Sequence, residues 1–324
     1  MAKKKEPLPP PPTKDGELIT QITEKLEVFF NDPNRKQVTV YDLGPFSVSR
    51  LKLLEKCRLK FFLDQLLKVT PKPLTEGDGM LRHIGHAAHF ALEQMIIGVH
   101  FREAMEETKN RYHDILGQDW GTVEGLLPNM LNFVDRVDVF KTKHRITKVF
   151  TEQKLAITKD LKPCDFYSKE AVFRGIIDLR MTTERRDNIL VDHKNGGDPE
   201  HGLKNYSRQL DATKVLARFG TQEGCVGAQG GIHFITAGDV RMDTYKRAEI
   251  IETVMARELF QDIADAVINT QEAGVFKQDK ACSICDYCDY RHLCKAEGYK
   301  RGTAGELEFV VQESKKMFGN LTEV

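Results

Sequence analysis

Two apolar segments separated by a short polar stretch constrain the fold of this 324-residue chain more than any other feature. The segments cover residues 172–180 and 189–194, and the polar stretch 182–188 between them is typical of a hairpin loop. Each segment carries one carboxylate near its end, Asp178 in the first and Asp192 in the second. The sequence therefore predicts two antiparallel strands that bring two acidic side chains together.

The residues around Asp192 indicate what such a pair could bind. Asp192 and Lys194 are two apart, so on a strand their side chains leave the same face, whereas His193 points to the other. Two carboxylates with an ammonium group beside them suit a hard divalent cation that retains water and binds a phosphate. Such a site hydrolyses phosphodiesters, with Lys194 positioning or activating the water. The alternative is a buried hairpin in which an aspartate and a lysine form an ordinary ion pair.

The composition limits the partners that a global charge could attract. Lys+Arg and Asp+Glu are equal at 48 each, so any nucleic-acid surface must be local. With 40% hydrophobic residues, the chain can bury a large core. It contains no run of about 18 apolar residues and no signal-peptide pattern, so we expect a soluble, intracellular protein.

Hydrophobic periodicity predicts a mixed α/β fold. The lysines and prolines of residues 1–16 predict a disordered tail. A small central mixed sheet flanked by helices is expected from the strand-like and helix-like patterns. The expected strands are 148–157, 171–181, 188–194 and 230–236, and the expected helices are 17–30, 51–66, 80–97, two within 98–143, one through 208–217, and 244–269.

Residues from three further parts of the chain could add to the site. The helix over 80–97 places His83, His86 and His89 near one face with Glu93 one turn beyond, although a helical histidine is by default a surface or core residue. Glu152 either adds a third carboxylate or is an exposed strand residue. Gln209 either hydrogen-bonds DNA or a metal-bound water, or is simply exposed.

Four cysteines lie within thirteen residues near the C-terminus: Cys282, Cys285, Cys288 and Cys294. This density indicates metal or cluster ligation and not a secreted disulfide framework. Four thiolates could hold zinc, but the spacings are tight for one zinc knuckle, and an iron–sulfur cluster also takes four thiolates. Cys57, which we expect inside the helix over 51–66, is by itself typical core filler, but with three late cysteines it would tie the two ends of the fold together.

Taken in order, these residues resemble the RecB-type branch of the PD-(D/E)XK nuclease superfamily, particularly the iron–sulfur exonucleases related to the AddB nuclease domain and the CRISPR-adaptation nucleases. The resemblance runs from Ser47 to Cys294. It rests on Ser47-x-Ser49-x-Leu51 with Cys57 and Phe61, Gly85-x3-His89-x2-Leu92-Glu93, Gly175-x2-Asp178, Asp192-x-Lys194, Gln209-Leu210 and Cys285-x2-Cys288-x5-Cys294. The chain departs from the family pattern at Arg58, Ile177 and Thr213, and Cys282 is surplus to it.

The resemblance implies a restriction-endonuclease-like nuclease domain over 17–299, with a helical insert at about 98–143, an iron–sulfur segment over 282–294 and a C-terminal tail over 300–324. It implies Mg²⁺ or Mn²⁺ bound by His89, Asp178 and Asp192, with the carbonyl of His193 between the strand ligands. Lys194 would be catalytic, Gln209 would serve the family's glutamine motif and Glu152 would be a supporting carboxylate. A [4Fe–4S] clasp would be held by Cys57, Cys285, Cys288 and Cys294.

The resemblance also implies an activity. We expect a metal-dependent DNA nuclease, in particular a single-strand-preferring exonuclease of recombination, repair or phage DNA metabolism in the cytoplasm of a bacterial or phage-infected cell. The sequence has no Walker A motif, so a helicase activity would belong to a partner. The alternatives are a non-catalytic DNA-end-binding or assembly module with the same fold, and a zinc-clasped protein of unrelated fold.

Overall fold

The computed structural model describes residues 21, 24–25, 44–69, 80–196, 199, 202–272, 288 and 290. The predicted tails 1–16 and 300–324, most of the predicted helix 17–30, and Cys282, Cys285 and Cys294 lie outside the described residues. The chain divides into two compact units. The larger unit comprises residues 44–51 and 75–265, and the smaller comprises 1–43, 52–74 and 266–324.

The larger unit is built on a mixed sheet, as the sequence predicts. Its strand order is β2-β1-β3-β4-β5-β6, with β7 also paired to β5, and only the β4–β5 pair is parallel. The four predicted strands are all present, but the short strands β2, β6 and β7 were not predicted. The bounds are β1 Ile146–Ile157, β2 Pro163–Cys164, β3 Phe173–Thr183, β4 Asp187–Lys194, β5 Gly227–Phe234, β6 Asp239–Met242 and β7 Lys246–Arg247.

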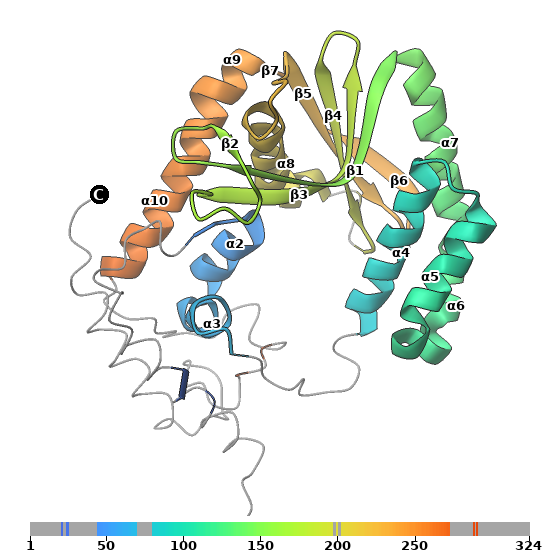
Figure 1. Cartoon of the computed structure of the whole chain (residues 1–324), viewed down its shortest axis with the longest axis horizontal. Helices are drawn as coiled ribbons and strands as arrows, with labels where there is room; N and C mark the ends of the chain where they lie inside the picture. The colour runs from blue at the N-terminus through green and yellow to red at the C-terminus, as the bar shows by residue number, and fades with distance from the viewer. Residues whose placement is uncertain are drawn as a thin grey trace, which may run out of the picture. The chain divides into compact units, whose positions relative to one another are not determined.

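The helices of the insert, and α4 before it, pack on one face of this sheet. They are α4 Met80–Ile96, α5 Phe101–Leu116, α6 Trp120–Gly125 and α7 Leu127–Lys143 (Figure 1). The predicted break between two helices is confirmed: Gly117 has φ +46°, which ends α5, and a 3-10 turn and α6 precede α7. Side chains from these helices share one hydrophobic core with Leu179 and Met181 of β3 and Ile189 and Val191 of β4.

The parallel β4–β5 pair requires a crossover, and α8 Gly202–Phe219 supplies it (Figure 1). Leu210 of this helix packs on Ile232 and Phe234 of β5. Gly175 of β3 allows a close approach, because a Cβ there would lie 2.7 Å from a methyl carbon of Leu216. The position of α8 beside the end of β4 therefore depends on small and apolar residues at these contacts.

Part of the segment that precedes the sheet departs from the prediction. The predicted helix over 51–66 is two helices and a π-helical turn: α2 Val48–Lys56, α3 Arg58–Phe61 and η2 Phe62–Leu66. Cys57 interrupts them with an extended backbone (φ −153°), and its Sγ accepts a hydrogen bond 3.4 Å from the Lys60 amide. Cys57 is thus the N-cap of α3 and does not lie inside a helix, so that part of the prediction is wrong.

The predicted helix over 244–269 also begins later than expected, because Lys246 and Arg247 pair with β5. It consists of α9 Ala248–Ile250, a π-helical turn η4 Ile251–Met255, and α10 Ala256–Glu272. Among the described residues, none of the helices combines the length and apolar character needed to cross a membrane.

The fold generates a prediction about how α8 is held. Lys214 of α8 is fully buried and pairs with Asp211, at 3.0 Å, and with Asp243, whose other oxygen accepts a hydrogen bond from the Gly230 amide. Lys214→Ala would leave Asp243 without its cation and should lower the free energy of unfolding by roughly 3 kcal/mol, as for other buried pairs that lose one partner. Chemical denaturation measures this effect.

The control is Asp138→Asn, which removes an exposed ion pair with Lys141. It should change the free energy of unfolding by less than about 1 kcal/mol. Equal effects of the two substitutions would contradict the anchoring role of Lys214.

Candidate active site

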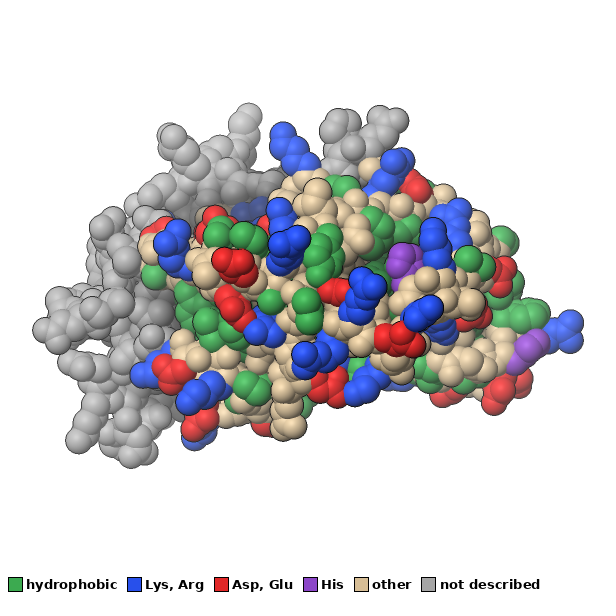
Figure 2. All heavy atoms as spheres, turned by 90° about the horizontal axis from the view of Figure 1, so that it is seen from above, with side chains coloured by type: hydrophobic (Ala, Val, Ile, Leu, Met, Phe, Trp, Pro, Cys, Tyr) green, Lys and Arg blue, Asp and Glu red, His purple; other side chains and the backbone are tan. Residues whose placement is uncertain are grey.

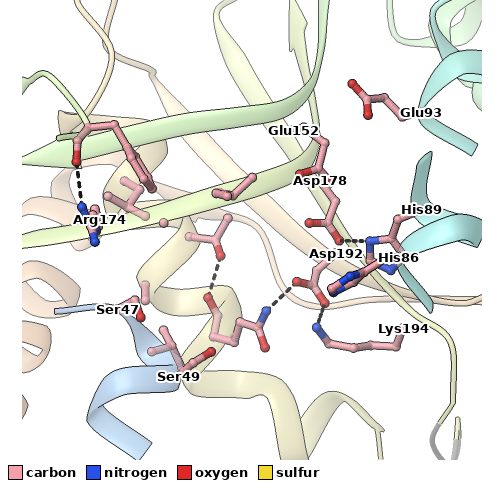
Figure 3. Close-up of a pocket in the computed structure, with 18 of the residues that line it drawn as sticks. Ser47, Ser49, His86, His89, Glu93, Glu152, Arg174, Asp178, Asp192 and Lys194 are labelled. Carbon is pink, nitrogen blue, oxygen red and sulfur yellow. Dashed lines mark hydrogen bonds and ion pairs between the residues drawn. The ribbon is translucent and has the colours of Figure 1, made fainter. Parts of the chain in front are cut away.

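The two aspartates of the predicted hairpin lie where its strands separate. Pairing between β3 and β4 ends at Leu179 and Val191, and the next residues outward are Asp178 and Asp192. Beyond this point the backbone amide of His193 donates a 2.7 Å hydrogen bond to Oδ2 of Asp178 instead of continuing the ladder. Both carboxylates therefore face a common space at the end of the hairpin (Figure 3).

A third carboxylate reaches the same place from the neighbouring strand. The Thr151–Leu179 and Gln153–Ile177 pairs of β1 and β3 place Glu152 opposite Asp178. Glu152 has φ +46°, which is strained for a residue with a long side chain and commonly occurs at functional sites. Atoms of Glu152, Asp178 and His89 that could ligate a metal all lie within 4.8 Å of one another. The predicted alternative of an exposed Glu152 does not hold, because the residue is half-buried within this group.

His89 is the histidine of α4 that lies closest to the carboxylates in the described contacts. Its Nδ1 is 3.7 Å from Oδ2 of Asp178. His86 lines the same cavity, and the His83 ring contacts that of His86 with centroids 6.3 Å apart. Glu93, one turn beyond His89, accepts a 3.2 Å hydrogen bond from the Thr151 hydroxyl and also lines the cavity.

Asp192 is bound by two neighbouring side chains. Nζ of Lys194 lies 2.5 Å from its Oδ2, and Nε2 of Gln209 on α8 donates a 2.5 Å hydrogen bond to its Oδ1 (Figure 3). The Asp–Lys ion pair considered from the sequence is thus formed, but it borders the cavity instead of being sealed in a core. Gln209 is held against Asp192 and does not extend into solvent.

The side chain of His193 lies on the face of β4 opposite to Asp192, where its ring packs edge-on against that of His89 with centroids 5.6 Å apart. It is buried, its Nδ1 is 3.0 Å from Nδ1 of His233, and Phe133 of α7 contacts the rings of both histidines. Burial lowers the pKa of both His193 and His233, the latter to about 3, so the pair is neutral. The His193 ring therefore belongs to the packing beneath the helical insert, and only its backbone is near Asp178.

Burial governs the charge of the carboxylate group. It is the largest cause that raises the pKa of Glu152 from 4.5 to about 7 and those of Asp178 and Asp192 from 3.8 to about 6. The neighbouring carboxylates raise the pKa of Glu152 and Asp192 further. Burial also lowers the pKa of His89 to about 4, which leaves its imidazole neutral and able to ligate a metal. The site thus concentrates negative charge that a bound cation would stabilise.

The residues present fit a divalent metal ion. Carboxylate oxygens are the preferred ligands of Mg²⁺, and an added imidazole nitrogen is compatible with Mn²⁺. Three such donors converge at 4.8 Å or less, and Asp192 stands beside them. A bound cation would also stabilise the charged forms of these acids, whose pKa values are raised mainly by burial and, for Glu152 and Asp192, also by neighbouring carboxylates.

These groups line a cavity of about 890 Å³, all of whose lining residues belong to the larger unit. Three arginines that sequence reasoning missed also line the cavity: Arg50, Arg111 and Arg174. Phe46 places Arg50 and Arg174 together, because its backbone amide and carbonyl bond to Val172 and Arg174. The burial of Arg50 and the nearby Arg174 charge lower the Arg50 pKa to about 10. No sequence signal separates these three arginines from the others.

The cavity is lined by both cationic and acidic side chains, and the outer surface is also mixed. On the face shown in Figure 2, Lys and Arg side chains are interspersed with Asp and Glu side chains over the described part of the chain. This agrees with the equal numbers of acidic and basic residues. A polyanionic ligand would therefore be recognised locally, with arginines and a metal site in one cavity.

No curated protein matches the chain. A solved structure titled "Crystal structure of SSO0001" is 12% identical over 86% of this chain and 95% of that chain, with a TM-score of 0.28, which is too low to support an argument. The family model described as "PD-(D/E)XK nuclease superfamily" matches residues 45–295, a range that includes every site residue above. On this match, the chain belongs to the PD-(D/E)XK nuclease superfamily.

Proposed function

We propose that the protein is a Mg²⁺- or Mn²⁺-dependent DNA nuclease, and specifically an exonuclease that prefers single strands. The observation that carries the proposal is the convergence of His89, Glu152 and Asp178 beside the Asp192–Lys194 pair in one cavity. The family supports a metal-dependent nuclease. An exonuclease of recombination, repair or phage DNA metabolism, with a helicase partner, is the biological role that we propose for it.

The metal ligands in this proposal are His89, Asp178 and Asp192, with the carbonyl of His193. From the sequence, Glu152 was expected only as a supporting carboxylate. Because its carboxylate lies within 4.8 Å of the possible ligand atoms of His89 and Asp178, we assign it a place beside the ion as well. When bound, the ion supplies positive charge that polarises the phosphoryl group and makes water more acidic. The protein contributes the shape of the site and the buried acids that hold it.

Lys194 and Glu152 can act on the attacking water. The Lys194 ammonium lies at the edge of the carboxylate group, where it can donate a hydrogen bond and orient the water oxygen toward phosphorus. Glu152, whose carboxylate lies beside His89 and Asp178, can accept the proton that the water loses as the P–O ester bond breaks. Gln209 acts as a positioning residue, since its amide holds Asp192.

An iron–sulfur clasp on Cys57, Cys285, Cys288 and Cys294 is the second part of the proposal. Within the smaller unit, Cys57 and Cys288 are both buried. Tyr290, two residues after Cys288, is also buried and donates a 2.8 Å hydrogen bond to Asp64, while Nζ of Lys60 is 5.1 Å from its ring centroid. These contacts bring Tyr290 onto the α3–η2 segment, at whose start Cys57 is the N-cap, and they support the proposal. A cluster there would be a structural clasp, because it would close a very long loop.

A second candidate function is a DNA-end-binding module that does not cut. The close Lys194–Asp192 ion pair favours it, because a lysine engaged in this way can be purely structural. Binding without cleavage in the presence of each divalent metal would support the module and exclude the nuclease.

Substitutions of the site test the nuclease directly. Asp178→Asn and Lys194→Ala should each lower Mn²⁺-dependent degradation of end-labelled single-stranded DNA by more than about 100-fold, because they remove a ligand and the group that orients the water. Asp239→Asn on the same sheet, which pairs with Arg241 at the surface, serves as the control and should retain activity. Wild-type activity in either site variant would remove the assignment.

The raised pKa values predict how metal and pH act on stability. Because the folded-state pKa values of Glu152, Asp178 and Asp192 exceed their ordinary values, the metal-free protein should lose stability as pH rises from about 4 to about 7. Mn²⁺ should offset this loss and raise Tm more at pH 8 than at pH 5. Thermal unfolding with Mn²⁺ or with EDTA measures the effect. An equal metal-induced shift at both pH values would contradict the clustered acids as ligands.

The clasp predicts a metal content. Anaerobically purified protein should contain about four iron and four sulfide ions per chain. Cys57→Ser and Cys288→Ser should reduce both and lower Tm, whereas Cys225→Ser, at a buried cysteine of the larger unit, should keep the iron. Zinc in stoichiometric amount without sulfide would eliminate the cluster.

A further inference from the structure

The helices α4 and α5 contribute a group of flat side chains to the cavity. Phe90 of α4 and Tyr112 of α5 have ring centroids 6.4 Å apart at an interplanar angle of 56°. The guanidinium carbon of Arg111 lies 4.5 Å from the Phe90 centroid and 5.9 Å from that of Tyr112. All three residues line the cavity that holds the carboxylates. None of the roles proposed above uses them.

The exposure of these residues differs from that of a core cluster. Phe90 and Tyr112 are half-buried and Arg111 is exposed, whereas Ala87, Ala88 and Ala91 on α4 are fully buried. The rings therefore keep part of their surface open toward the cavity, and the Arg111 cation covers another part. Aromatic surface left in contact with water in a concave site gains free energy when a flat ligand covers it.

Their position relative to the carboxylates limits what that ligand can be. Phe90 directly follows His89 on α4, and Tyr112 lies across from it on the adjoining helix. A nucleotide whose phosphate reached the His89–Glu152–Asp178 group would therefore bring its base near this part of the wall. Aromatic rings and arginine planes bind unpaired bases by stacking and by cation–π attraction, irrespective of base identity.

We propose that Phe90, Arg111 and Tyr112 form a stacking platform for an unpaired nucleobase of single-stranded DNA, beside the phosphate that is cut. The inference rests on the proposed nuclease function and deepens it, because it names the residues that select single strands. A base within a duplex is already stacked and paired and would have to be extracted first. The platform thus favours strands whose bases are free.

The test measures binding without cleavage. The full-length Asp178→Asn protein is titrated onto a fluorescent single-stranded oligonucleotide and onto a series in which one base at a time is replaced by an abasic residue. Loss of one base should weaken binding by about 10-fold at one or two positions, since each stacked base contributes on the order of that factor. Tyr112→Leu should weaken binding of the intact oligonucleotide to the same degree and remove the effect of abasic replacement. Tyr112→Phe should retain the original affinity and the effect of abasic replacement.

The chain offers a matched control for the arginine. Arg102 lies on the same helix and covers the Phe101 ring at 5.7 Å, outside the residues that line the cavity. Arg111→Ala should weaken single-strand binding several-fold while Arg102→Ala leaves it unchanged, although both remove one positive charge. Thermal unfolding of each variant verifies that it is folded.

The outcomes separate this inference from the proposed function. Suppose that the wild-type chain cuts DNA, but Tyr112→Leu binds every oligonucleotide as Tyr112→Phe does and Arg111→Ala binds as Arg102→Ala does. The stacking proposal is then wrong, and the nuclease proposal stands. A uniform loss of affinity with the effect of abasic replacement retained would also overturn the stacking proposal, because that pattern indicates charge or folding and not stacking. An RNA oligonucleotide of the same sequence shows whether the sugar contributes.

Discussion

The structure of the site depends on the burial of carboxylates that have too few cations to balance them. Burial is the largest cause of the raised pKa of Glu152, Asp178 and Asp192, and repulsion between the acids adds to the shifts of Glu152 and Asp192. A fold tolerates such an arrangement only if surrounding packing holds it in place or if a ligand compensates it. Here the β1–β3–β4 ladder fixes the backbone of all three residues, so the acids cannot separate to relieve their repulsion.

The strands and helices around the acids hold the site residues in place. The left-handed backbone of Glu152 turns a central strand residue toward the hairpin end, at a cost that the pairs on either side of it offset. Gln209 reaches Asp192 because α8 crosses close to β3 at Gly175 and is anchored by buried Lys214. The insert helices and α4 cover the opposite face, and α4 contributes His89. Each layer of the fold thus places one part of the site.

The parts of this arrangement that follow local periodicity could be predicted from sequence. A period of two residues places Asp192 and Lys194 on one face and His193 on the other, and the contacts agree. Local periodicity could not predict three features: the extended backbone at Cys57, the left-handed backbone of Glu152, and the proximity of Arg50 to Arg174. The last two result from long-range contacts: the Phe46 bridge to β3 brings the arginines together, and the register of β1 with β3 places Glu152.

The same contrast explains why the sequence did not indicate that aromatic residues of α4 and α5 line the cavity. Residues 98–143 show ordinary amphipathic periods, and an aromatic residue at a half-buried helical position has the same sequence signature as a core residue. Phe90 and Tyr112 become distinct only when α4 and α5 pack side by side and leave their rings against the cavity that contains His89. The proposed binding of a polyanion therefore requires no net positive charge on the chain. In this fold the cations, the flat side chains and the clustered acids all line one cavity, and the buried acids interact there more strongly than they would in open water.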